Sequence, residues 1–298
     1  MKVEVGSKEN REEFLAYCRV HRLEVDDSYL YDEDLMEFKE GEKNPTFVIR
    51  EGGVIVAVAS IILDDYHRRG NRGRFRIFHS VNQRVEDYQA LFHALEPAIS
   101  DLEHVIVFVS DEDPKMAEAM EALGFFVERS SCLLRRETKE IQPLPELPDG
   151  FSLQIFQPGI DESNWAGVRN QAFAKLLGSQ TPLTEEQVVK MTQEDVHLPQ
   201  GMMILFDRTQ AIGLVRGADD EYEDQPIMDI GPLAVLPEYQ GRGLGRYLLR
   251  AAISFGKQKG YGKVVLSVNA ENERAKSLYL KEGFVQVEGI RCFRWNIK

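Results

Sequence analysis

The stretch PEYQGRGLGRYLL, from Pro237 to Leu249, decides the fold of the second half of the chain. Its glycines alternate, at Gly241, Gly243 and Gly245, and lead into a segment where apolar residues recur every three or four positions. That spacing is typical of one face of an amphipathic helix. A helix N-terminus has unpaired N–H groups and a positive dipole end, so glycines placed there predict a phosphate-binding loop.

Two common phosphate motifs do not fit this loop. Arg246 takes the place of the third glycine of G-x-G-x-x-G, and no Gly-Lys-Ser/Thr follows as in a nucleoside-triphosphatase loop. The segment QGRGLG does fit Q/R-x-x-G-x-G/A. A second signature, VVLSVNAENERAKSLYLKEGF, follows from Val264 to Phe284.

Together the two signatures resemble those of the GCN5-related N-acetyltransferase (GNAT) superfamily, and the resemblance covers nearly all of the second half. It implies an α/β (α+β) domain whose mixed, mostly antiparallel sheet has a splayed strand pair and flanking helices. It also implies acetyl-CoA as cofactor, its pyrophosphate held by backbone amides and an arginine. The cofactor-binding loop would then comprise Gln240, Gly241, Arg242, Gly243, Leu244, Gly245 and Arg246.

The resemblance also implies where the rest of the cofactor lies. The pantetheine arm would enter the gap between the splayed strands and pair with strand backbone around Val235. The amide of Leu233 would polarise the thioester carbonyl as an oxyanion donor. Asn272 stands where the family often uses an asparagine to bond the arm.

Acetyl transfer requires a neutral amine, a stabilised oxyanion and a proton for the departing thiolate. Tyr279 lies in the predicted helix after Asn272, at the family's position for a phenol that protonates the sulfur. A packing role is the alternative, because Leu278 and Phe284 beside it are core residues. Loss of turnover in Tyr279→Phe with cofactor binding retained would distinguish the two roles.

Asp229 is the candidate general base. It lies on the strand before the glycine loop, where the histone-modifying branch of the family carries a glutamate. Aspartate is shorter, so a bridging water would be needed, and many family members use water alone. A hydrogen-bonded carboxylate at a strand start is the alternative.

The clearest domain boundary is EIQPLPELPDGF, from Glu140 to Phe151, because its three prolines interrupt both helix and central strand. An apolar strand, a helix ending in Gly-Phe and a final strand with a cysteine occur on both sides of it. From Val107 to Leu266 and from Gly124 to Gly283 the shift is 159 positions. We therefore predict two tandem GNAT-like domains: a degenerate copy at 1–140, a linker at 141–150 and an active domain at 151–298.

The hydrophobic pattern predicts the elements of the second half. Helices are expected at 164–177, 185–194, 245–258 and 273–281, a hairpin at 202–217, and strands at 228–235, 263–268 and 290–295.

The first half retains this outline but lacks the glycine loop. Aligning Gln83 with Gln240 places Glu86 and Tyr88 at the positions of Gly243 and Gly245. A carboxylate repels a pyrophosphate, so we expect this half not to bind coenzyme A in the usual way. The shift of 159 matches Tyr279 with Met120 and Asn272 with Asp113.

Two charged segments stand out. YHRRGNRGRFR, from Tyr66 to Arg76, is predicted as a hairpin connection, either a solvated turn or a contact for a phosphorylated ligand or an acidic surface. GADDEYEDQP, from Gly217 to Pro226, is predicted as a loop, either solvated or attractive to a cationic acceptor. Its carboxylates are Asp219, Asp220, Glu221, Glu223 and Asp224.

Composition narrows the function classes. A net charge of −13 and an isoelectric point near 5.1 argue against nucleic-acid binding. No apolar run suggests a membrane span or a signal peptide, so no membrane partner is expected. The cysteines Cys18, Cys132 and Cys292 lack metal-ligand spacing and fit a reduced, cytoplasmic protein without a metal.

These observations predict a cytoplasmic N-acetyltransferase that moves an acetyl group directly from acetyl-CoA to a primary amine of a small molecule. No cysteine stands near the predicted sulfur position, which argues against a covalent enzyme intermediate. The alternative is a non-catalytic acyl-CoA-binding sensor. Retained Asn272 and Tyr279 favour the enzyme.

Overall fold

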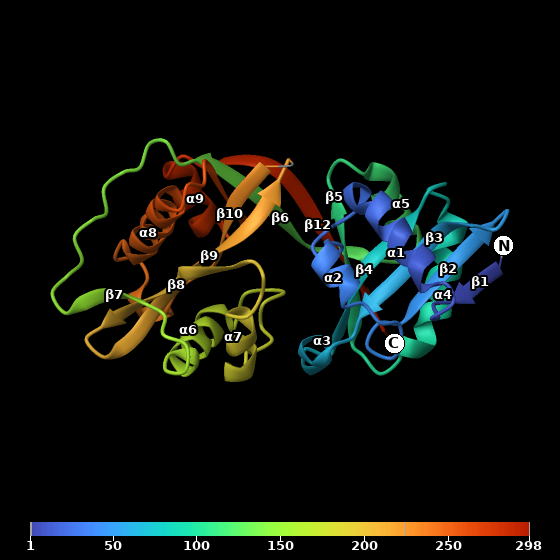
Figure 1. Ribbon diagram of the computed structural model, residues 1–298, viewed down its shortest axis with the longest axis horizontal. Helices are drawn as coiled ribbons and strands as arrows, with labels where there is room; N and C mark the ends of the chain where they lie inside the picture. The colour runs from blue at the N-terminus through green and yellow to red at the C-terminus, as the bar shows by residue number, and fades with distance from the viewer. Residues whose placement is uncertain (1, 224, 298) are drawn as a thin grey trace. The chain divides into compact units, whose positions relative to one another are not determined.

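The computed structural model describes residues 2–223 and 225–297 (Figure 1). It divides into two compact units. The first comprises Met1–Ser131 and Glu288–Lys298, and the second comprises Cys132–Val287. Each is an α/β unit whose sheet is mostly antiparallel, as predicted.

The first unit has the strand order β1-β2-β3-β4-β5-β12. Its strands are β1 (Lys2–Val5), β2 (Thr46–Glu51), β3 (Val54–Ile62), β4 (Arg72–Ser80), β5 (His104–Ser110) and the end of β12 (Val285–Asn296). Its helices are α1 (Arg11–Val20), the 3-10 turn η1 (Arg22–Glu24), α2 (Asp32–Met36), α3 (Asp65–Arg69), α4 (Val85–Ile99) and α5 (Pro114–Ala122).

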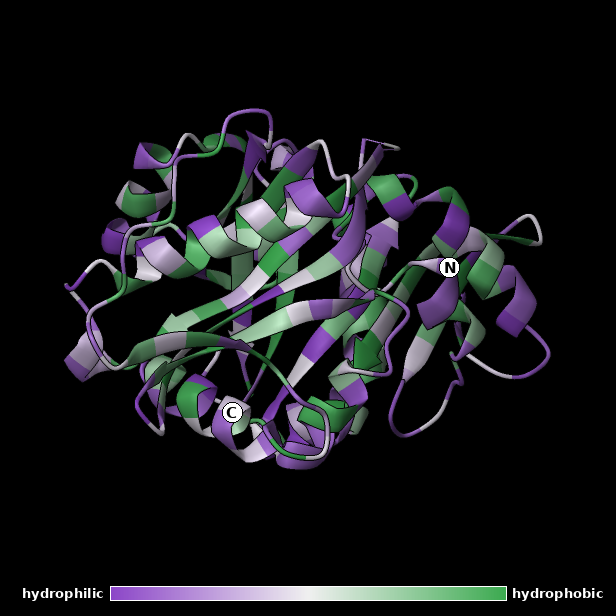
Figure 2. Ribbon diagram, turned by 60° about the vertical axis from the view of Figure 1, so that its left-hand side comes forward, coloured by the Kyte–Doolittle hydropathy of each residue, from purple (hydrophilic) through white to green (hydrophobic). Residues whose placement is uncertain are grey.

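Alternation along the central strands gives this unit two cores, because successive strand side chains point to opposite faces. Ile49 and Ala57 pack beneath α4 and α5. Their neighbours Val48 and Val58 pack with Phe14 of α1. In Figure 2 hydrophobic and hydrophilic residues alternate along both the strands and the helices, as expected where each element has one face on a core.

The second unit has the strand order β6-β11-β10-β9-β8-β7. Its strands are the end of β6 (Phe126–Glu137), β7 (Phe151–Ile155), β8 (His197–Asp207), β9 (Gln210–Tyr222), β10 (Gln225–Val235) and β11 (Lys263–Asn269). Its helices are α6 (Glu162–Phe173), α7 (Glu185–Met191), η2 (Pro237–Tyr239), α8 (Leu244–Gln258) and α9 (Glu273–Lys281).

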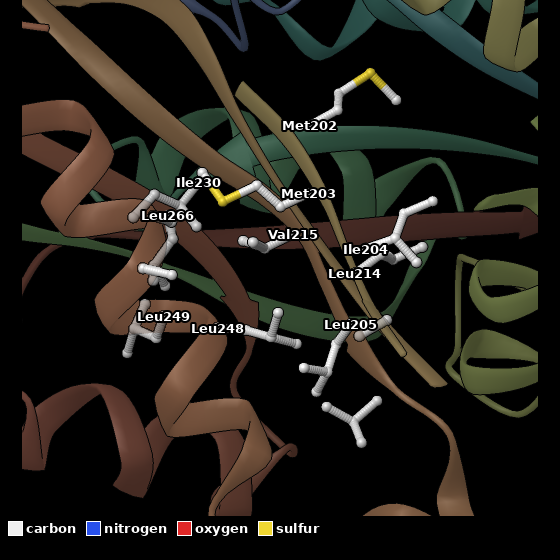
Figure 3. Packing of buried hydrophobic residues seen from close by; sticks show 14 of the residues in the cluster. Met202, Met203, Ile204, Leu205, Leu214, Val215, Ile230, Leu248, Leu249 and Leu266 are labelled. Carbon is white, nitrogen blue, oxygen red and sulfur yellow. The ribbon is translucent and has the colours of Figure 1, made fainter. Parts of the chain in front are cut away.

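One hydrophobic core holds the second unit together. Leu248 and Leu249 of α8 point toward the sheet, where they meet Leu214 of β9 and Ile230 of β10 (Figure 3). The contact is close, because a Cβ added at Gly213 would lie 3.1 Å from Leu248. This packing sets the axis of α8, and with it the position of the glycine loop at its start.

The last strands are exchanged between the units, a feature absent from the predicted ranges. Residues 132–140 group with the second unit, where Cys132 and Leu134 join its core. The end of the chain groups with the first unit, where Phe293 joins the core and the Trp295 ring packs edge-on against Phe92 at 4.9 Å. Each unit is therefore completed by the final strand of the other half of the sequence.

The internal repeat is more regular than predicted. α4, β5, α5 and β6 begin and end 159 positions before α8, β11, α9 and β12, respectively. This register pairs Arg84 with Gly243 at the two N-caps, and Glu86 with Gly245. The alignment through Gln83 was therefore wrong by two positions. Tyr88 lies in the core of its unit, 5.0 Å from the Phe78 ring.

The arginine-rich segment connects β3 to β4, which pair antiparallel, as predicted for a hairpin connection. It forms α3 and the start of β4, and Arg72 and Arg76 are buried. Arg74 donates to Asp26 at 2.6 Å within the same unit. Arg68 and Arg69 in the connection are exposed, whereas the arginines of β4 are part of the packed fold.

The acidic segment is also more ordered than a loop. Asp219, Asp220 and Glu221 lie at the end of β9, which pairs with β10 up to Tyr222 and Gln225. The hydroxyl of Tyr261 donates to Asp219 at 2.6 Å, and Arg135 donates to Glu223 at 2.8 Å. Asp224, also named above, lies outside the described residues.

Cys18, Cys132 and Cys292 are buried, and none of them forms a disulfide in the structure. Within the described residues, none of the helices combines the length and apolar character needed to cross a bilayer.

Candidate active site

Parting of β10 from β11 creates the candidate site in the second unit. The two strands pair in parallel only at Met228–Val264 and Asp229–Val265. Beyond Asp229, β10 continues to Val235 beside β9 alone. The predicted splay is therefore present. In the first unit, β4 and β5 likewise pair only from Arg72 to Arg74.

The edge of β10 that faces the gap carries backbone N–H groups that β9 does not bind. An extra residue interrupts its register with β9 between Ile230 and Leu233. Beyond it, Leu236 donates its N–H to Ile212 of β9. Alternate residues of an antiparallel strand turn their N–H and C=O groups to opposite edges. The amides of Leu233 and Val235 therefore face away from β9, toward the gap.

The glycine loop leads into α8 in the predicted way. Gly241 and Gly243 have φ of 85° and 81°, in the left-handed region that favours glycine. Gly243 is the N-cap of α8 and has no side-chain cap. Within the described chain, the backbone N–H groups from Gly241 to Arg246 make no hydrogen bond. Six successive donors, with Leu244 and Gly245 among them, are thus available at the positive end of the helix.

Three arginines lie around the loop. Arg246 forms an ion pair with the buried Glu282 (3.0 Å), which Arg250 also binds. Arg242 lies over the Tyr239 ring, 5.1 Å from its centroid. Arg274 of α9, which the motif comparison missed, lies against the loop. A Cβ at Gly241 would be 3.6 Å from its Nη2.

Gln240 connects the loop to both neighbouring elements. Its Nε2 donates to the carbonyl of Val235 at 3.0 Å, and its Oε1 accepts from Arg274 Nη1 at 3.0 Å. These contacts hold the start of the loop against the open end of β10. The order Asn-Glu-Arg after β11 was the available signal for Arg274, since it places an arginine in the first turn of α9.

Asn272 is the N-cap of α9. Its Oδ1 accepts from the amide of Ala275 at 3.2 Å. Asp113, its counterpart in the repeat, caps α5 in the same way through Met116. Capping therefore accounts for the side-chain oxygen of Asn272, whereas its Nδ2 remains free for a ligand among the described contacts.

Tyr279 is buried within α9 and its ring lies 6.0 Å from that of Phe284. Burial raises the pKa of Tyr279 to about 12, so the phenol keeps its proton at neutral pH. Its hydroxyl makes no hydrogen bond in the part of the chain that the structure describes. The ring packs in the core, as the alternative packing role predicts, but its hydroxyl donates to none of the described residues.

Asp229 is half-buried at the point where β10 and β11 separate. Burial raises its pKa from the usual 3.8 to about 7, and the charge of Asp220 adds to the rise. Arg216 and the amide of Ile230 oppose it. A carboxyl with this pKa can accept a proton near neutral pH.

The corresponding place in the first unit is differently built. Arg84, the N-cap of α4, donates to the buried Asp87 and to Glu51. Asp87 also accepts from the hydroxyl of Ser80 at 2.7 Å. The helix start that is bare in α8 thus carries ion-paired side chains in α4.

A splayed sheet next to a bare helix start is the arrangement that the resemblance to the GNAT superfamily predicts. The sequence model of the Acetyltransferase (GNAT) family matches residues 171–284, which include β10, the glycine loop and α9. The match identifies residues 171–284, which make up most of the second unit, as a GNAT domain.

Curated relatives and solved structures agree with this assignment. The chain is 33% identical over 175 residues to the mycothiol acetyltransferase of Thermobispora bispora, covering 57% of this chain and 59% of that protein. It is 34% identical over 171 residues to the mycothiol acetyltransferase of Pseudarthrobacter chlorophenolicus, covering 55% and 51%. The matches thus span less than two thirds of these relatives.

Two solved structures share the fold over the full chain. A GCN5-related N-acetyltransferase from Sphaerobacter thermophilus superposes with a TM-score of 0.74 at 18% identity, covering 100% of this chain and 96% of that chain. A tandem GNAT protein from the clavulanic acid biosynthesis pathway gives 0.70 at 15% identity, covering 100% and 99%.

Proposed function

We propose that the second unit transfers an acetyl group from acetyl-CoA to a primary amine of a small molecule. The uncapped run of six amides from Gly241 to Arg246 carries this proposal, because unpaired N–H groups at a helix start bind anions such as the diphosphate of coenzyme A. Arg274 adds a positive charge beside the loop. Arg246 would contact the diphosphate while remaining paired with Glu282.

From the loop, the thioester would reach the gap between β10 and β11. The amide of Leu233 would donate to the thioester oxygen as it becomes an oxyanion. Backbone groups around Val235 would pair with the arm, and Nδ2 of Asn272 would donate to it.

The reaction then needs two proton transfers. The amine nitrogen attacks the thioester carbonyl carbon and the C–S bond breaks. Asp229 accepts the proton that the amine loses, directly or through a water, and Tyr279 donates its phenolic proton to the departing thiolate. Solvent restores the proton on Tyr279. No acyl group is attached to the protein at any stage.

The acceptor is proposed to be a mycothiol-related amine, because the matched relatives are mycothiol acetyltransferases. The carboxylates of Asp229 and Asp220 would favour an amine that arrives as a cation. Mass detection of acetylated product from a panel of mycothiol-related and other amines tests the acceptor.

Tyr279→Phe tests the mechanism. We expect at least a tenfold lower kcat and unchanged affinity for acetyl-CoA in calorimetry, since the hydroxyl contributes only in the transition state. An unchanged kcat would remove Tyr279 from the mechanism. Tight acetyl-CoA binding without transfer to any amine would favour the alternative, a non-catalytic acyl-CoA sensor.

A further inference from the structure

His21, Glu24 and His79 form a cluster in the first unit that the proposed acetyl transfer does not use. His21 follows α1, Glu24 ends η1, and His79 lies near the end of β4. One ligand atom from each residue lies within 4.8 Å of the other two. We call these three residues the His–Glu–His cluster.

Glu24 holds the two imidazoles together. Its Oε1 lies 2.8 Å from Nδ1 of His21, and its Oε2 lies 3.2 Å from Nε2 of His79. The two rings are 4.8 Å apart. Each carboxylate oxygen therefore faces a different ring nitrogen.

Tyr17 orients His79 from its other side. The Tyr17 hydroxyl lies 2.8 Å from Nδ1 of His79 and 3.2 Å from the carbonyl of Val56. A carbonyl can only accept, so satisfying both contacts sends the hydroxyl proton to Val56 and leaves the proton on Nδ1. In that tautomer, Nε2 of His79 presents a lone pair to Glu24.

A lone pair facing a carboxylate requires a cation between them. A metal ion satisfies both groups, and a partner that orients the second nitrogen of a ligating histidine is a common feature of metal sites. The Glu24 side chain is 55% exposed, so an ion can enter from solvent.

We propose that the His–Glu–His cluster binds a divalent transition-metal ion of the zinc class. Imidazole and carboxylate ligands suit zinc, and three protein ligands leave the fourth position to water. The bound ion would link α1 and η1 to β4. The cysteine spacing, on which the expectation of no metal was based, gave no indication of this site, because His79 is far from His21 and Glu24 in the sequence.

The untagged full chain, treated with a chelator and then dialysed, is titrated with Zn²⁺ and, separately, with Co²⁺. We expect one equivalent of either ion to bind and Co²⁺ to give the intense visible absorption of four-coordinate sites. Zn²⁺ should also raise the melting temperature.

His79→Gln and Glu24→Gln should each abolish the stoichiometric binding. His93→Gln is the matched control, because His93 faces Glu96 at 3.0 Å with the same i,i+3 spacing and has no third ligand in the described chain. It should bind like wild type. Glu24→Gln changes an exposed side chain, so circular dichroism should show an intact fold. The proposal would be overturned if the wild type bound neither ion, or if both cluster variants bound the ions as well as the wild type does.

Discussion

The elevated pKa of Asp229 makes the stability of the second unit depend on pH, and Asp229→Asn should remove that dependence. The carboxyl has a pKa of about 7 in the folded chain and 3.8 ordinarily. Asparagine has a similar shape and no charge at any pH, so the substitution isolates the effect of ionisation.

The sign follows from proton uptake. Between about pH 4 and pH 7, the folded state holds a proton on Asp229 that the unfolded state has lost, so stability falls as pH rises. The difference of about 3 pH units, at about 1.4 kcal/mol each, gives a cost of about 4 kcal/mol above pH 7. Below pH 4 both states are protonated and the cost vanishes.

Urea unfolding followed by tryptophan fluorescence measures this effect. Trp165 is fully buried in the second unit and Trp295 belongs to the first, so a Trp295→Phe background reports on the second unit. The free energy of unfolding of Asp229→Asn, taken relative to that background, should rise steadily from pH 4 to pH 7 and then level off. Because Asp229 is only half-buried, a gain of 2–4 kcal/mol is expected.

A stability difference that is constant between pH 4 and pH 8 would refute the elevated pKa. The same ionisation should appear in catalysis, because a general base must be deprotonated. Turnover of the wild type should rise with pH through about 7, and Asp229→Asn should lose that rise together with most of its activity.

Three further results are expected. Gly243→Ala should weaken acetyl-CoA binding about tenfold or more, because the added Cβ would stand where the phosphate must approach. The control is Gly260→Ala, where φ is also positive (94°) and no neighbour lies within 4 Å; it should lower only the stability, by the backbone strain of about 1 kcal/mol that both variants share. If calorimetry gave Gly243→Ala the affinity of wild type, the loop would not be the phosphate site. Asn272→Ala should lower stability by about 1 kcal/mol through loss of the α9 cap, and Asn272→Asp should retain the cap yet bind the cofactor more weakly than wild type; full affinity in the aspartate variant would exclude Nδ2 as a ligand contact. A fragment of residues 151–298 should be largely unfolded by circular dichroism, because the fragment lacks the core strand that residues 132–137 supply to the second unit. A cooperative unfolding transition of that fragment would contradict the strand exchange.

Local physics made much of this protein predictable from its sequence. A glycine loop before an amphipathic helix predicts both the helix start and its unpaired amides, because backbone conformation there depends on neighbouring residues. The α9 bounds, Glu273–Lys281, were predicted without error because Asn272 caps the helix and Gly283 follows it. The repeat shift of 159 positions was visible for the same reason, since each copy carries its own local signals.

Contacts between distant residues were decided only by the tertiary structure. The ion pair of Arg246 with Glu282, the place of Arg274 beside Gly241 and the pKa of Asp229 all depend on how separate elements pack. The exchanged strands show the limit most clearly, because β6 and β12 have the same length and corresponding places in the repeat. The side chains that they bury, Leu134 in one unit and Phe293 in the other, determine where each strand belongs.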